Sequence, residues 1–158
     1  MGAGYHPGVR DSVTVHMRVP AERIWPLVSD ITETKRFAAE TFEAEWLDGA
    51  TGPGVGVRFR GHVKRNGWGP VYWSVCTIDA CEPGREFAFT VGLAGRPANR
   101  WCYRFEPNGE GTDVTESFEL QNTLPLRLYW ALLGWARRKT NVENMRTTLE
   151  RIKAAAEA

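Results

Sequence analysis

Two charged residues of this sequence fall where the surrounding pattern is apolar. Glu116 shares one face of an alternating stretch with Phe118, and Arg138 lies on an apolar helical stripe between Trp135 and Val142. Burying an unpaired charge is strongly unfavourable. We therefore expect one of two arrangements. Either the two residues meet inside the protein and orient a ligand carbonyl or carboxylate, or Glu116 sits at a strand end and Arg138 extends its charge to water.

Tyr103 and His62 are the other candidates for acid/base chemistry. His62 falls on the same strand face as Arg58, Arg60 and Lys64, a pattern that predicts contact with water. Tyr103 is therefore the stronger candidate. In a cyclase or dehydratase, such groups polarise a carbonyl or move a proton.

The common catalytic and cofactor motifs are absent from the sequence. It has no G-x-S-x-G, no Cys/His pairing, no P-loop and no dinucleotide fingerprint. Hydrolase, kinase and oxidoreductase functions therefore have no support, and we expect no cofactor. Any enzyme activity would have to rest on acid/base groups in a pocket.

The cysteines favour a reducing compartment. Cys76, Cys81 and Cys102 are odd in number, and two of them fall in expected strands. No C-x-x-C pair is present, and the three histidines are scattered. We expect three buried thiols that are dispensable for folding, with neither a disulfide nor a metal site.

Length and charge limit the class of protein. The 158 residues suit one domain over 12–158, after a flexible lead-in at 1–11. With 20 basic and 19 acidic residues, there is no net field to hold nucleic acid. No apolar run approaches the ~20 residues of a membrane span, and the first residues lack a signal-like apolar segment. We expect a cytoplasmic protein.

Periodicity predicts a strand, two short helices, six more strands and one long helix. The short helices are expected at 21–28 and around 32–37, and the long helix from 125 to 158 with a bend or break near 134–140. The expected strands alternate apolar and polar residues and are separated by Gly, Pro and Asn turns. They cover 12–19, 42–46, 57–64, 72–80, 87–93, 100–106 and 112–120.

The long helix needs an apolar partner, and only the inner face of the sheet offers enough area. We therefore predict an α+β fold in which a curved antiparallel sheet of about seven strands wraps the helix. Aromatic side chains on that face are either core or the wall of a void. The candidate ligand-binding residues are Phe59, Phe87, Phe89, Trp101, Tyr103, Glu116, Phe118, Trp135, Arg138, Val142 and Met145.

Several motifs in this order resemble a known superfamily. They are 13–25, 73–89 with its turn at 82–87, 101–107, 111–116 and 149–153. Together they resemble the START-like, helix-grip superfamily, and within it the bacterial polyketide cyclase/dehydrase-like (SRPBCC) proteins. The resemblance implies a hydrophobic cavity between sheet and helix, used in the superfamily for lipids, sterols, polyketides and plant hormones. It implies no catalytic residue, because the matching motifs are turns and strand ends.

Three functions remain open at this point. The leading one is binding or transport of a small hydrophobic or amphipathic molecule. The alternatives are a cofactor-independent cyclase or dehydratase and a protein-interaction module. The segment 124–135 is more apolar than one helix face can bury, which makes it a candidate homodimer contact.

Overall fold

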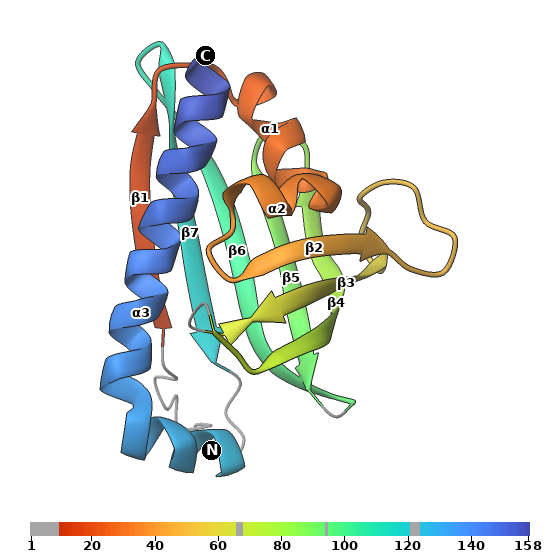
Figure 1. Cartoon of the computed structure of the whole chain (residues 1–158). Helices are drawn as coiled ribbons and strands as arrows, with labels where there is room; N and C mark the ends of the chain where they lie inside the picture. Colours follow the sequence, from red (N-terminus) through yellow and green to blue (C-terminus); the bar gives the residue numbers. More distant parts are fainter. Residues whose placement is uncertain (1–9, 66–67, 94, 121–123) are drawn as a thin grey trace, which may run out of the picture.

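Seven strands form one antiparallel sheet in the order β1-β7-β6-β5-β4-β3-β2. The computed structural model describes residues 10–65, 68–93, 95–120 and 124–158, with the backbone alone at 93 and 124–135. Figure 1 shows the sheet curving beside one long helix, as predicted. The strands are β1 (Arg10–Met17), β2 (Thr41–Trp46), β3 (Arg58–Lys64), β4 (Val71–Glu82), β5 (Glu86–Leu93), β6 (Arg96–Asn108) and β7 (Gly111–Leu120).

The first strand follows the predicted alternation. Val13 and Met17 are buried, and the residues beside them face outward. β1 already begins at Arg10, because β7 is long enough to pair with it there. β1 thus includes residues 10 and 11 of the predicted lead-in at 1–11, and 1–9 lie outside the described residues.

The two short helices lie where the sequence predicts them. They are α1 (Ala21–Ser29) and α2 (Thr34–Phe37), the latter preceded by a 3-10 turn, η1 (Ile31–Glu33). The Asp30 side chain accepts a hydrogen bond from the Thr32 backbone N–H at 3.1 Å. This side-chain cap starts the turn, a role for which aspartate is among the preferred residues.

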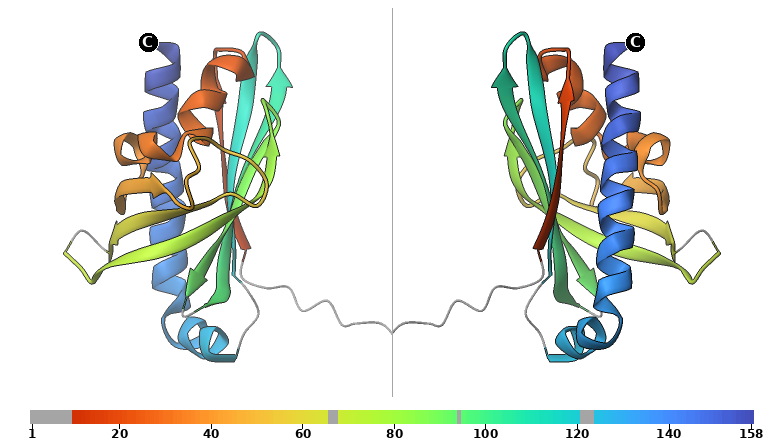
Figure 2. Two further views of the ribbon diagram at one scale, coloured as in Figure 1. Left: turned by 90° about the vertical axis from the view of Figure 1, so that its right-hand side faces the viewer. Right: turned by 90° about the vertical axis from the view of Figure 1, so that its left-hand side faces the viewer.

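The long helix, α3 (Leu124–Glu157), packs along β1 and β7. Met145, Leu149 and Ile152 of the predicted stripe are buried there. The helix bends rather than breaks: Figures 1 and 2 show its first turns running across the end of the molecule and the rest running along the sheet.

The sheet curves because its register shifts at several places. An extra residue in one strand increases the local twist and bends the strand. Figure 2 shows β2 and β3 turned away from the direction of β1 and β7. The shifts occur between Thr41 and Glu43, between Ile78 and Ala80, and between Val91 and Gly92.

The three cysteines are free thiols, two buried and Cys81 half-buried. Burial raises the pKa of Cys76 to about 12, so that thiol is protonated and unreactive. Among the described residues, no group of His, Cys, Asp and Glu side chains has an arrangement that could hold a metal ion. No helix in the described part of the chain is both long and apolar enough to cross a membrane.

Candidate functional site

The concave face of the sheet has a filled end and a more open end. At the filled end, Trp25 of α1 packs on Phe87 and Phe105, with ring centroids 6.1 and 5.7 Å apart. Further along the same two strands, away from α1, Phe89 and Trp101 keep part of their surface accessible. The aromatic face is therefore not covered over its whole length.

The apolar candidates from the sequence divide between the core and this accessible surface. Those fully buried in the core are Phe59, Phe87, Phe118 and Met145. Those that remain partly accessible are Phe89, Trp101, Tyr103 and Val142. The side chain of Trp135, and those of the proposed dimer segment 124–135, lie outside the described residues.

Glu116 and Tyr103 form a polar pair on this otherwise apolar face. They are directly opposite each other in β7 and β6. The Tyr103 hydroxyl donates a hydrogen bond to Glu116 Oε1 at 2.9 Å. Glu116 is only 4% exposed, and its Oε2 is buried with no hydrogen-bond partner among the described residues.

Burial controls the protonation of both groups. It raises the pKa of Glu116 to about 8, although the hydrogen bond from Tyr103 acts in the opposite direction. Burial and the neighbouring Glu116 raise the pKa of Tyr103 well above its usual value. At neutral pH the phenol is therefore neutral, and the carboxyl exists mainly in its protonated form.

Arg138 is not the partner of Glu116, so this predicted pairing is wrong. The Arg138 guanidinium instead binds Asp11 of β1, with Nε–Oδ2 and Nη2–Oδ1 distances of 3.1 and 3.0 Å. Its side chain is 50% exposed. It lies at the edge of the helix stripe, where the long side chain reaches a carboxylate on the sheet's edge strand rather than the interior.

His62 lies on the outer face, as its neighbours in the sequence predict. Its ring lies 4.3 Å from Phe42 and stacks on Trp73 at 4.2 Å, between centroids. It therefore belongs to an exposed aromatic cluster and lies on the opposite side of the sheet from Tyr103.

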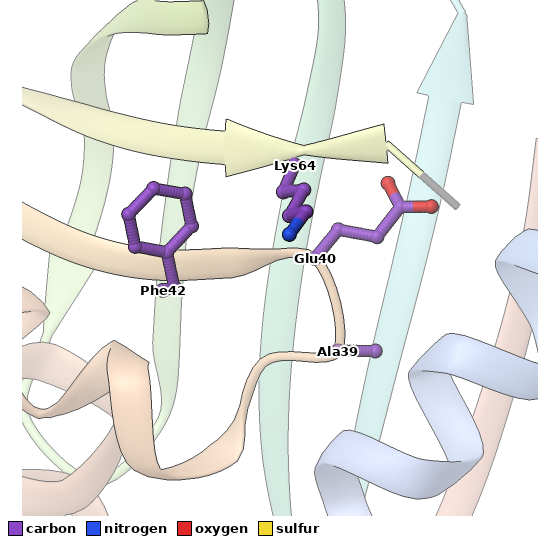
Figure 3. Close-up of a pocket in the computed structure, with 4 residues that line it drawn as sticks. All are labelled: Ala39, Glu40, Phe42 and Lys64. Atoms are coloured by element: carbon purple, nitrogen blue, oxygen red, sulfur yellow. The ribbon is translucent and has the colours of Figure 1, made fainter. Parts of the chain in front are cut away.

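Glu40, just before β2, forms an ion pair with α3. Its carboxylate accepts two hydrogen bonds from Arg137 of α3, at 2.9 and 2.8 Å. Beside this ion pair lies a recess of about 320 Å³ lined by Ala39, Glu40, Phe42 and Lys64 (Figure 3). Of the predicted site residues whose side chains the structure describes, none lines that recess.

The fold is that of a known family. A family model described as "polyketide cyclase / dehydrase and lipid transport" matches residues 9–157. The chain belongs to this family. The resemblance seen in the sequence is thus confirmed, and the description covers both enzymes and transport proteins. No curated protein matches the chain.

Solved structures of low sequence identity share the fold. TTHA0849 from Thermus thermophilus is 19% identical with a TM-score of 0.72, and covers 94% of this chain and 97% of its own. DR_A0006 from Deinococcus radiodurans is also 19% identical, with a TM-score of 0.67 and the same coverage. The Polyketide_cyc-like protein Cgl2372 from Corynebacterium glutamicum is 24% identical, with a TM-score of 0.54, covering 94% and 87%. At these identities, the likeness shows the fold alone.

One further polar residue of this polyketide cyclase/dehydrase family member lies on the same face and was not predicted from the sequence. Asn99 precedes Trp101 and Tyr103 at the same two-residue spacing on β6, and its Oδ1 is buried with no hydrogen-bond partner among the described residues. Extending the alternation of β6 by one step would have found it. The expected strand started at residue 100 and excluded it.

Proposed function

We propose that the protein binds a small hydrophobic or amphipathic molecule, lipid-like or polyketide-like, against the concave face of the sheet beside α3. The observation that carries this proposal is the partly accessible surface of Phe89, Trp101 and Tyr103 on a face where the Tyr103 hydroxyl also binds the buried Glu116. Ligand sites in proteins combine mainly apolar walls with a few fixed polar groups. The family's description, which includes lipid transport, supports the same function.

Ligand binding is expected to quench tryptophan emission, because Trp101 lies on the proposed wall, and to raise the melting temperature. At ligand concentrations about 100 times Kd, the stabilisation should be about 2.7 kcal/mol. For a domain of this size, that is a rise of about 5 °C or more. Fatty acids, sterols, flavonoids and aromatic polyketides form the test panel, with native mass spectrometry of the purified protein as an independent search for bound molecules.

The location of the site is tested by two phenylalanine substitutions. Phe89→Ala should weaken binding about tenfold, since burying a phenylalanine against a ligand contributes about 1.5 kcal/mol or more. Phe42→Ala is the matched control, because Phe42 is 45% exposed and contacts His62 on the outer face. Equal affinities for the two variants, or no response to any ligand in the panel, would contradict the proposal.

A second candidate function is cofactor-independent cyclisation or dehydration, and the Glu116–Tyr103 pair is the observation that favours it. The ionised fraction of Glu116 would take a proton from a carbon beside a carbonyl group, and the Tyr103 hydroxyl would stabilise the oxygen on which charge develops. A base with a pKa of about 8 is well matched to work near neutral pH.

Turnover of an aromatic-polyketide precursor with several ketone groups tests this second function. Mass spectrometry should detect the loss of water from the precursor, and Glu116→Gln should slow the loss at least about a hundredfold, within the range of general-base contributions. If binding occurs but wild type and Glu116→Gln give the same rate as buffer alone, the protein is a binding protein only.

A further inference from the structure

The Glu116 carboxyl leaves one of its two oxygens unsatisfied in the protein interior. Tyr103 occupies Oε1, whereas Oε2 is buried without a partner among the described residues. Nearly all buried polar atoms in native proteins have a hydrogen-bond partner, because an unsatisfied one is unfavourable. An orphan atom beside partly accessible aromatic side chains is the arrangement expected of a group that binds a ligand.

Among the described residues, the strand neighbours of Glu116 supply no positive charge. On either side in the sheet it lies opposite Val13 and Tyr103. The buried α3 residues Asn141 and Met145 are uncharged. Two arginines at this end of α3, Arg137 and Arg138, are hydrogen-bonded to Glu40 and Asp11. Among the described residues, a carboxylate ligand brought to Glu116 would therefore meet another carboxyl group without a cation between them.

A protonated carboxyl has one donor to offer. With the Tyr103 hydroxyl donating to Oε1, the acid proton is carried by Oε2, the atom without a partner. The raised pKa of Glu116 keeps that proton in place at neutral pH. The complementary ligand atom is an uncharged acceptor, such as a ketone, ester or hydroxyl oxygen.

A second unsatisfied atom lies on the same face. Asn99 precedes Tyr103 by four residues on β6, a distance of about 13 Å along a strand, with Trp101 between them. Its buried Oδ1 would accept a hydrogen bond from a hydroxyl or amide group. The two sites are separated by roughly the length of a medium-chain or multi-ring molecule.

We propose that Glu116, held by Tyr103, is the polar anchor of the binding site and selects an uncharged ligand with a carbonyl or hydroxyl oxygen over the corresponding carboxylate. This inference rests on the proposed binding function and specifies its ligand class. It predicts that fatty acid anions bind poorly to this protein although their chains are apolar.

Three probes of equal chain length test the selection: dodecyl methyl ketone, tetradecane and myristate. Their dissociation constants are measured by tryptophan quenching at pH 6.5 and pH 9. In the wild-type protein at pH 6.5, the ketone should bind about tenfold more tightly than the alkane or myristate. At pH 9, Glu116 is mainly ionised and its donor is lost. The ratio of the alkane to the ketone dissociation constant should therefore fall close to one.

Two variants separate a hydrogen bond from a general effect on the fold. Glu116→Gln keeps a donor that does not titrate, so it should retain the preference for the ketone at both pH values. Glu116→Leu removes the donor, so its ketone and alkane affinities should be equal at both. Thermal melting confirms that each variant is folded, and Glu116→Met serves if the leucine variant does not fold.

The outcomes distinguish this inference from the function on which it rests. Equal binding of all three probes by the wild-type protein, tighter binding of myristate, or a ketone preference that survives in Glu116→Leu would overturn the selection but leave ligand binding intact. Failure of all three probes to bind would overturn the proposed function itself, and the inference with it.

Discussion

Replacing Glu116 with glutamine is expected to make the ligand-free protein markedly less sensitive to pH. Glu116 has a folded-state pKa of about 8, above its ordinary value of 4.5. The folded state therefore binds the proton more tightly than the unfolded chain does. The stability that this provides is complete below about pH 4.5 and is lost as pH rises toward 8.

The expected loss in the wild-type protein is about 1 kcal/mol for each pH unit between pH 5 and pH 8, relative to Glu116→Gln. Tyr103, the titratable group in contact with Glu116, remains neutral over this range because its own pKa is raised well above the usual value. Val13, the neighbour of Glu116 in β1, and the buried α3 residues Asn141 and Met145 do not titrate. The difference in the pH dependence of the unfolding free energy between wild type and Glu116→Gln therefore measures the titration of Glu116.

Urea denaturation at pH 5, 6, 7 and 8 provides the measurement. Glu119→Gln is the matched control, because Glu119 lies three residues away on β7 and is exposed. Its stability curve should run parallel to that of the wild-type protein. If the Glu116→Gln curve is also parallel, Glu116 does not hold its proton in the folded state.

Loss of the Glu40–Arg137 ion pair is the second large effect that we expect. The two side chains are only 14% and 12% exposed, and they join α3 to the segment before β2. Arg137→Met would remove two hydrogen bonds from a mostly buried carboxylate, which Arg65 approaches only to 3.5 Å. Breaking a buried pair from one side typically destabilises by about 3 kcal/mol or more.

Arg58→Met is the control for this substitution. Arg58 also binds a carboxylate, that of Asp48, with two nitrogens, and both side chains are about half exposed or more, at 49% and 62%. Exposed ion pairs contribute at most about 1 kcal/mol to the free energy of unfolding.

A double-mutant cycle measures the Glu40–Arg137 pair directly. The effects of Arg137→Met and Glu40→Gln on the free energy of unfolding should be coupled by more than about 1 kcal/mol. Equal effects of the two arginine substitutions would show that burial of the Glu40 pair is unimportant.

Side-chain periodicity in the sequence was enough to predict the elements and the faces that they bury. Glu116 was assigned to the buried face of its strand because residues two apart lie on one side of a strand, whatever the rest of the fold does. The same rule placed His62 on the outer face. The three- and four-residue steps predicted the buried stripe of α3 in the same way.

Partners far apart along the chain were decided only by the tertiary structure. Tyr103 meets Glu116 because β6 and β7 pair in a register that puts them opposite each other. Arg138 binds Asp11 because α3 lies along β1, so a residue at the edge of the stripe reaches the sheet's margin. A local pattern specifies which face a side chain occupies, but not which strand lies beside it.

The accessible part of the concave face also depended on the tertiary structure. The sequence predicted the aromatic residues of that face without separating core from ligand wall. Trp25 of α1 covers Phe87 but does not reach Phe89, only two residues further along β5 on the same face. Whether a side chain on the sheet is covered depends on where the neighbouring helix ends, and the packing of the whole domain sets that position. The face of the sheet that a side chain occupies depends only on the backbone of its own strand.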